Sequence, residues 1–239
     1  MRDTPLRLTD ATAVDRRDFL RAGAGLTAAF LLPLAAAGAT TPTPPSGAVR
    51  NVLLINAHQR YPGISEGRLN ATLAALIREE MEKQGREVRE TYIEQGYDPA
   101  SEVQKHLWAD LIVTQSPVFW FGAPWIHKKY VDDVFTAGMI QPLFLTGDGR
   151  TPEDPSRQYG TGGKLQGKQY LLSLTMNTPR EAFDDPAQRL HAGRSLDDLF
   201  AAHTAAYKFC GVSILPAFGS FNVVKAPDVP GDSQRLRQH

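Results

Sequence analysis

Three consecutive aromatic residues, Phe119, Trp120 and Phe121, stand in the stretch 116–125 of the sequence. Aromatic side chains are usually covered, so this stretch either packs in the core or forms a surface that a ligand covers. Exposed at the carboxyl end of a strand, the three rings would make an apolar wall for a flat, ring-shaped ligand. Gly122 has no side chain and would let the backbone approach such a ligand closely. The stretch is a candidate binding segment, with core packing as the alternative.

A second candidate lies where residues 57–65 lead into Glu66-Gly67-Arg68-Leu69-Asn70, at the expected start of a helix. The first backbone N–H groups of a helix have no partner inside the helix and can bind a phosphate. Glu66 would then have to point away, and a plain connecting loop is the alternative. The sequence contains neither G-x-G-x-x-G nor G-x-x-x-x-G-K-[ST], which argues against a Rossmann dinucleotide site and a P-loop.

Proton transfer near neutral pH is the chemistry of histidine, and His191 is the candidate proton donor. The alternative is a polar loop histidine, and surface or cap roles equally suit His58 and His127. Cys210 is the only cysteine, so an internal disulfide and a cysteine-rich metal centre are excluded. The motifs H-E-x-x-H and G-x-S-x-G do not occur, and we expect no metal site.

The elements that must position these residues alternate along the chain. Apolar runs predict five strands, at residues 51–56, 88–93, 111–113, 170–174 and 212–215. Helical spacing and capping residues predict helices at 69–81, 98–108, 124–138 and 195–209. This alternation predicts an α/β fold, a doubly wound parallel sheet of order 2-1-3-4-5 with helices on both faces. Ligands bind such sheets at the carboxyl ends of the strands, so the loops after strands one, three and four should converge.

The segment from Gly138 to Lys168 is polar and rich in glycine, and it is far longer than an ordinary connection of about four to six residues. Its length suggests a functional loop. The formal net charge is zero, with 26 basic and 26 acidic residues, and the basic residues are not clustered. This distribution offers no binding surface for nucleic acid.

The aromatic stretch and its neighbours also resemble a known family. Ser116-Pro117-Val118-Phe119-Trp120-Phe121-Gly122-Ala123-Pro124-Trp125 is similar to the flavin-contacting segment of DT-diaphorase and of the modulator of drug activity B family. Further segments follow in the family's order: Lys128 to Phe135, Asp148-Gly149-Arg150-Thr151, Tyr159-Gly160-Thr161-Gly162-Gly163, Leu172 to Pro179, Glu181-Ala182-Phe183 and Pro227-Asp228-Val229-Pro230. The resemblance covers residues 51 to about 230 and implies a flavodoxin-like fold.

The resemblance also implies an activity: FAD-dependent, two-electron reduction of quinones by NAD(P)H, through ping-pong hydride transfer. FAD would be the cofactor, NAD(P)H the electron donor and a quinone the acceptor, in a homodimer whose partner completes each flavin site. A non-catalytic flavin electron carrier or redox sensor with a protein partner is the first alternative, and a binding module without flavin is the second. The chain ends soon after Pro230, and we expect it to lack the family's final helix.

The site residues implied by the resemblance fall in the three loops and the long segment. The phosphate end of FAD is expected at Ser65, Gly67, Leu69, Asn70 and Thr72. The flavin ring is expected at Pro117, Val118, Phe119 and Trp120, with its polar edge at Thr175, Met176, Asn177 and Thr178. Tyr159 is expected at the cofactor and, with Asn177 and His191, in catalysis. Backbone N–H groups near Asn177 would stabilise negative charge on the reduced ring.

The first residues resemble an export signal. Arg16-Arg17-Asp18-Phe19-Leu20-Arg21 precedes an apolar, small-residue run from Ala22 to Ala39, as in twin-arginine signal peptides. We expect residues 1–39 to be the signal peptide, 40–48 a proline-rich linker and 49–239 the catalytic domain, delivered to the periplasm by the twin-arginine export machinery. An ordinary amphipathic first helix is the alternative.

Overall fold

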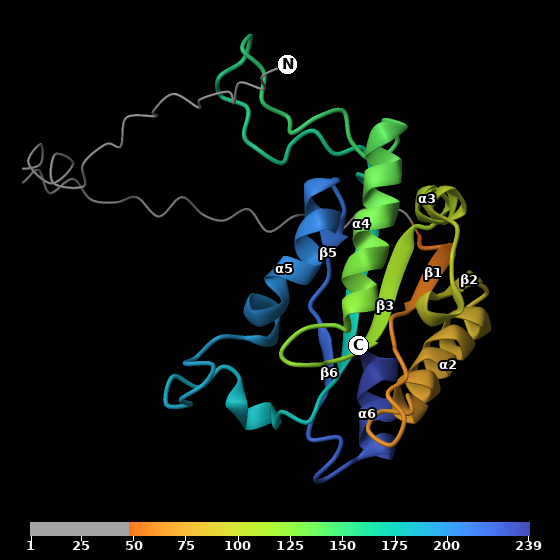
Figure 1. Ribbon diagram of the computed structural model, residues 1–239, viewed down its shortest axis with the longest axis vertical. Coiled ribbons are helices and arrows are strands. Elements are labelled where there is room, and N and C mark those ends of the chain that lie inside the picture. The colour runs from red at the N-terminus through yellow and green to blue at the C-terminus, as the bar shows by residue number, and fades with distance from the viewer. Residues whose placement is uncertain (1–47) are drawn as a thin grey trace, which may run out of the picture. The chain divides into compact units, whose positions relative to one another are not determined.

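The computed structural model describes residues 48–239, and Figure 1 shows them as a central sheet with helices packed against it. The predicted signal peptide and residues 40–47 of the predicted linker lie outside the described residues. Within the part described, no helix is long and apolar enough to cross a membrane.

The sheet is built from short parallel strands that are covered on both faces. Its first four strands are β1 (Asn51–Asn56), β2 (Glu87–Tyr92), β3 (Leu111–Pro117) and β4 (Gln169–Thr175). All pairings are parallel and, with β5 (Ser213–Ile214), the strand order is β2-β1-β3-β4-β5, which confirms the predicted topology. Every residue of β3 is buried, as expected for the central strand of a parallel sheet.

The fifth position of the sheet differs from the single strand predicted at 212–215. It consists of β5 (Ser213–Ile214), which pairs with the start of β4, and β6 (Phe218–Ser220), which pairs with the end of β4. Pro216 lies between them and has no N–H to donate to the ladder, so the strand is interrupted there. No sequence pattern predicted β6.

Helices cover both faces, as predicted. One face packs against α2 (Arg68–Lys83) and α6 (Val229–Gln238), and the other against α3 (Pro99–Trp108), α4 (Trp125–Ile140) and α5 (Leu196–Phe209). Alternate residues of β1 divide between these layers: Val52 and Leu54 face α2, whereas Leu53 and Ile55 face the other layer. Two short 3₁₀ turns, η1 (Ile93–Gln95) and η2 (Arg180–Ala182), follow β2 and β4.

The expectation that the chain lacks a final helix was wrong. The carboxylate of Asp228 accepts a hydrogen bond from the backbone N–H of Gly231 and caps α6, and a proline occupies its first turn. Leu236 packs against the α2 face of the sheet, and Arg237 forms an ion pair with Glu80 of α2 at 3.1 Å. The sequence Asp228-Val229-Pro230 is a helix start, although the family resemblance used it only as the last similar segment.

Candidate functional site

The loops after β1, β3 and β4 meet at the carboxyl edge of the sheet, as the topology predicts, and enclose a cavity of about 280 Å³ that we call the ring cleft. A fourth segment, after β6, closes one side. The lining residues are His58, Ile64, Ser65, Gly67, Arg68, Leu69, Asn70, Pro117, Val118, Phe119, Thr175, Met176, Asn177, Val223 and Val224.

The start of α2 forms one end of the ring cleft. Gly67 is its N-cap, with a φ of 76°, and none of the described side chains caps the helix. The first turn contains no acidic residue, so its backbone N–H groups and the helix dipole favour an anion there. Glu66 points away, because its carboxylate accepts hydrogen bonds from the Gly63 N–H at 2.9 Å and from Arg60 at 2.6 Å. These two bonds lower the pKa of Glu66.

A row of buried amides lies beneath the ring cleft and joins α2 to the sheet. Asn70 donates to the Asn56 side-chain oxygen at 2.9 Å and accepts from the Gln115 amide at 3.1 Å. The Ser173 hydroxyl donates to Gln115 at 2.7 Å. The row therefore crosses β1, β3 and β4, and it gives Asn70 a structural partner on each side.

The aromatic stretch forms a tight turn. The backbones of Phe119 and Gly122 hydrogen bond to each other in both directions, at 2.7 and 3.1 Å, and the φ angles of Trp120 and Phe121 are 46° and 67°. Both central residues are thus left-handed, which suits a type I′ turn but is strained for aromatic side chains. Trp120 is 92% exposed and Phe121 is 58% exposed, so core packing does not explain them. Phe119 lines the ring cleft and stacks on Tyr61, with ring centroids 4.6 Å apart.

The segment after β4 offers free backbone donors. The Thr175 carbonyl accepts from the Val118 N–H at 2.8 Å, which ties this segment to the aromatic turn. The Asn177 side-chain oxygen accepts from the N–H groups of Val224 and Lys225, each at 3.2 Å. Among the described residues, no hydrogen bond uses the backbone N–H of Asn177 or Thr178, so both can donate to a ligand.

His191 lies in the wall of a second cavity, of about 210 Å³, which we call the apolar pocket. It is lined by Val118, Phe121, Met176, Thr178, Phe183, Leu190, His191, Leu199 and Phe200, and it shares Val118 and Met176 with the ring cleft. His191 is buried and stacks on Phe183, with ring centroids 4.9 Å apart. Its Nε2 atom is buried and has no hydrogen-bond partner among the described residues.

Three of the predicted site residues do not line either cavity. Thr72 is on the exposed side of α2, and its hydroxyl donates to the Arg68 carbonyl at 2.9 Å. Trp120 projects into solvent. Tyr159 packs instead against Phe209, at the far end of α5, with ring centroids 5.0 Å apart.

Sequence reasoning missed several residues that shape the site. Tyr61 supports Phe119, and Gln115 and Ser173 form the amide row beneath the ring cleft. The last two carried a signal: a polar residue near the carboxyl end of an otherwise apolar strand. The part of the chain that the structure describes contains no cluster of three or more His, Cys, Asp or Glu residues suited to a metal ion.

Comparison with known proteins gives relatives over this whole region. The chain is 40% identical over 179 residues to the NADPH:quinone oxidoreductase MdaB of Haemophilus influenzae, covering 75% of this chain and 91% of that protein. It is 38% identical over 178 residues to an uncharacterised protein of Schizosaccharomyces pombe, covering 74% and 89% respectively. Human ribosyldihydronicotinamide dehydrogenase [quinone] is 28% identical over 153 residues, with 63% and 58% coverage.

Solved structures share the fold. A putative quinone reductase from Klebsiella pneumoniae superimposes with a TM-score of 0.64 at 22% identity, over 79% of this chain and 83% of that chain. General stress protein 14 of Treponema denticola, in complex with FMN, gives a TM-score of 0.54 at 17% identity, over 78% and 95%. The family model described as the flavodoxin-like fold matches residues 50–239. The chain therefore belongs to the flavodoxin-like fold family.

Proposed function

We propose that this protein is a flavin-dependent NAD(P)H:quinone oxidoreductase that works by ping-pong hydride transfer. The observation that carries the proposal is the ring cleft, which places an uncapped helix start and the Phe119 ring on the walls of one cavity. A relative named as an NADPH:quinone oxidoreductase, 40% identical over 75% of this chain, supports the same activity.

The residues of the ring cleft fit a flavin. The N-terminus of α2 would hold a phosphate, with Ser65 and Gly67 beside it. Pro117 to Phe119 would cover one side of the ring, and the free N–H groups of Asn177 and Thr178 would donate hydrogen bonds to its polar edge. The chemistry that a bound flavin supplies is hydride transfer, first from NAD(P)H to the flavin and then from the flavin to a quinone.

The apolar pocket is the proposed place for the quinone. It adjoins the ring cleft through Val118 and Met176, and its lining is almost wholly apolar. His191 would hold a proton at Nε2 for the quinone oxygen, because that buried atom has no hydrogen-bond partner among the described residues. Leu190 and Phe121 at the pocket rim would exclude water from the acceptor.

We propose FAD as the flavin, and FMN is the alternative. The choice of FAD rests on the resemblance of the aromatic turn and its neighbours to the modulator of drug activity B family. Extraction of the cofactor from the purified protein, followed by chromatography against FAD and FMN standards, tests this choice directly.

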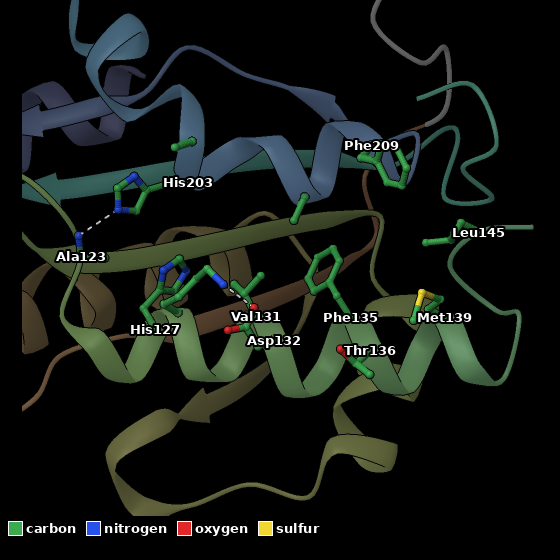
Figure 2. Close-up of a pocket in the computed structure, with 13 residues that line it drawn as sticks. Ala123, His127, Val131, Asp132, Phe135, Thr136, Met139, Leu145, His203 and Phe209 are labelled. Carbon is green, nitrogen blue, oxygen red and sulfur yellow. Dashed lines mark hydrogen bonds and ion pairs between the residues drawn. The ribbon is translucent and has the colours of Figure 1, made fainter. Parts of the chain in front are cut away.

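We further propose a homodimer in which Tyr159 acts on the flavin of the second copy. A groove of about 520 Å³ between α4 and α5, which we call the α4–α5 groove, extends from Ala123 beside the aromatic turn to Phe209, on which Tyr159 packs (Figure 2). A two-fold axis across the middle of this groove would bring the 141–168 segment of each copy to the aromatic turn of the other. Sedimentation equilibrium tests the dimer.

Residues 1–39 are proposed to direct the folded protein to the periplasm by the twin-arginine route. The support is the pair Arg16-Arg17 followed by the apolar run. Replacing both arginines with lysine should keep the protein in the cytoplasm of a host that has this route.

Anaerobic visible spectroscopy of the purified protein tests the proposed activity. NADPH should bleach the bound flavin, and a quinone added afterwards should restore its absorption. A bound flavin that NADPH does not reduce would favour the electron carrier with a protein partner. Protein that retains neither FAD nor FMN would overturn the proposal.

A further inference from the structure

His203, on α5, is hydrogen bonded to the backbone beside the aromatic turn. The Ala123 N–H donates to His203 Nε2 at 3.1 Å, and Figure 2 shows this bond reaching from the loop before α4 to the imidazole on α5. The ring lies so close to Gly122 that a Cβ atom there would stand 3.3 Å from Nε2. Glycine at position 122 thus lets the imidazole approach the backbone.

The aromatic turn needs such support from outside. Its two left-handed aromatic residues carry backbone strain, and such strain persists only where neighbouring structure fixes it. On one side, Tyr61 stacks on Phe119. On the other side, the bond from Ala123 is the side-chain hydrogen bond that holds the end of the turn.

We infer that His203 is a positioning residue, which fixes the aromatic turn by accepting the Ala123 hydrogen bond through Nε2. In this role it sets the place of Phe121 in the apolar pocket and of Phe119 in the ring cleft without touching either ligand. Its effect on turnover rests on the proposed function, whereas its effect on the turn does not.

The bond requires neutral imidazole with its proton on Nδ1. Protonation of Nε2 would place an N–H donor opposite the Ala123 N–H. The hydrogen bond would then be lost and the turn released. Burial lowers the pKa of His203, so the accepting form is retained to lower pH than in an exposed histidine. The neighbouring groups are His127 of α4, stacked on His203 at 6.2 Å, and the ion pair of Lys128 with Asp132 in the same groove.

A matched pair of variants tests the inference. His203→Gln keeps an acceptor close to the position of Nε2, whereas His203→Phe keeps the ring and removes the acceptor. Amide hydrogen exchange at Ala123, followed by NMR, should be about fivefold faster in the Phe variant, the factor that corresponds to a typical neutral hydrogen bond, and near wild type in the Gln variant. His127→Phe, which alters the stacked partner alone, should leave this exchange unchanged. Thermal unfolding of the three variants checks that each is folded.

Turnover gives the second readout. His203→Phe should raise KM for the quinone more than it lowers kcat. His203→Gln should restore KM and should lack the loss of affinity that we expect wild type to show as falling pH protonates His203. Equal exchange rates at Ala123 in wild type and His203→Phe would overturn the inference, whether or not the protein reduces quinones. Changed exchange without any change in turnover would overturn only its catalytic part.

Discussion

At the scale of single residues, Gly67 determines how closely the loop after β1 can approach the start of α2. Its φ of 76° is one that L side chains rarely adopt, and a Cβ atom would lie 2.5 Å from the His58 ring. Gly63, in the same loop, has a φ of 75° but open space where its Cβ would be. Both glycines have a backbone conformation that strains an L residue, but only at Gly67 would a Cβ atom meet a neighbouring side chain. Comparing the two positions therefore separates backbone strain from steric contact.

Gly67→Ala should therefore destabilise the protein by about 2 kcal/mol more than Gly63→Ala, because only the former displaces His58. It should also weaken flavin retention, because the helix start moves. Urea unfolding measures the first effect and flavin titration the second. Equal losses in both variants would show that strain alone acts at these positions.

His191→Phe preserves stacking on Phe183 but removes the ionisable nitrogen. If His191 supplies the proton, the rate of quinone reduction should fall about 100-fold, the usual range for general acid catalysis, whereas flavin reduction by NADPH should change little. Stopped-flow measurement of each half-reaction separates the two. Tyr92→Phe, on β2 and outside both cavities, is the control; an equal fall there would count against a proton-transfer role.

At the scale of elements, Asn70 and Thr72 stand on one helix and have different surroundings. Asn70→Ala would leave the buried Gln115 amide without its partner and would remove one of the two donors to the Asn56 oxygen, at a cost of about 2 kcal/mol in the free energy of unfolding. Thr72→Ala removes only an exposed hydroxyl bonded within its own helix, and should change stability by less than about 0.5 kcal/mol. Chemical denaturation checks both; a large loss at Thr72 would contradict this division.

The elements themselves were largely predictable. Apolar runs located the first four strands, because a strand that is buried on both faces has a continuous run of apolar residues. Periodicity with capping residues located α2 to α5, because a helix that is buried along one side has apolar residues at helical spacing. β6 is three residues long and leaves no strong pattern, whereas α6 has few apolar residues and shows a local signal only at its start, Asp228-Val229-Pro230. Their positions depend on pairing with β4 and packing on α2, which one local segment does not encode.

At the scale of the whole molecule, topology brought the loops after β1, β3 and β4 together, and this convergence followed from strand order alone. The sequence could not place Tyr159, because the segment 141–168 has no regular element to fix its direction. Nor could spacing identify the bond between Ala123 and His203, which joins residues 80 positions apart.

His106, a buried histidine on α3, makes stability depend on pH. Burial lowers the pKa of His106 from 6.5 to about 4. Between these values the unfolded chain binds the additional proton, so the free energy of unfolding falls as pH drops through this range, by about 2 kcal/mol at pH 5. His106→Asn, compared with wild type by urea unfolding at pH 7 and pH 5, should reduce the drop by that amount. An identical drop in both would contradict a buried neutral imidazole.

The central claim is that a planar redox ring lies in the cleft between the aromatic turn and the segment after β4. A crystal structure of the flavin-loaded protein tests it most directly. We predict the isoalloxazine against Pro117 to Phe119, its polar edge at the N–H groups of Asn177 and Thr178, and a phosphate at the start of α2. A flavin bound elsewhere, for example in the α4–α5 groove with the ring cleft empty, would contradict the account.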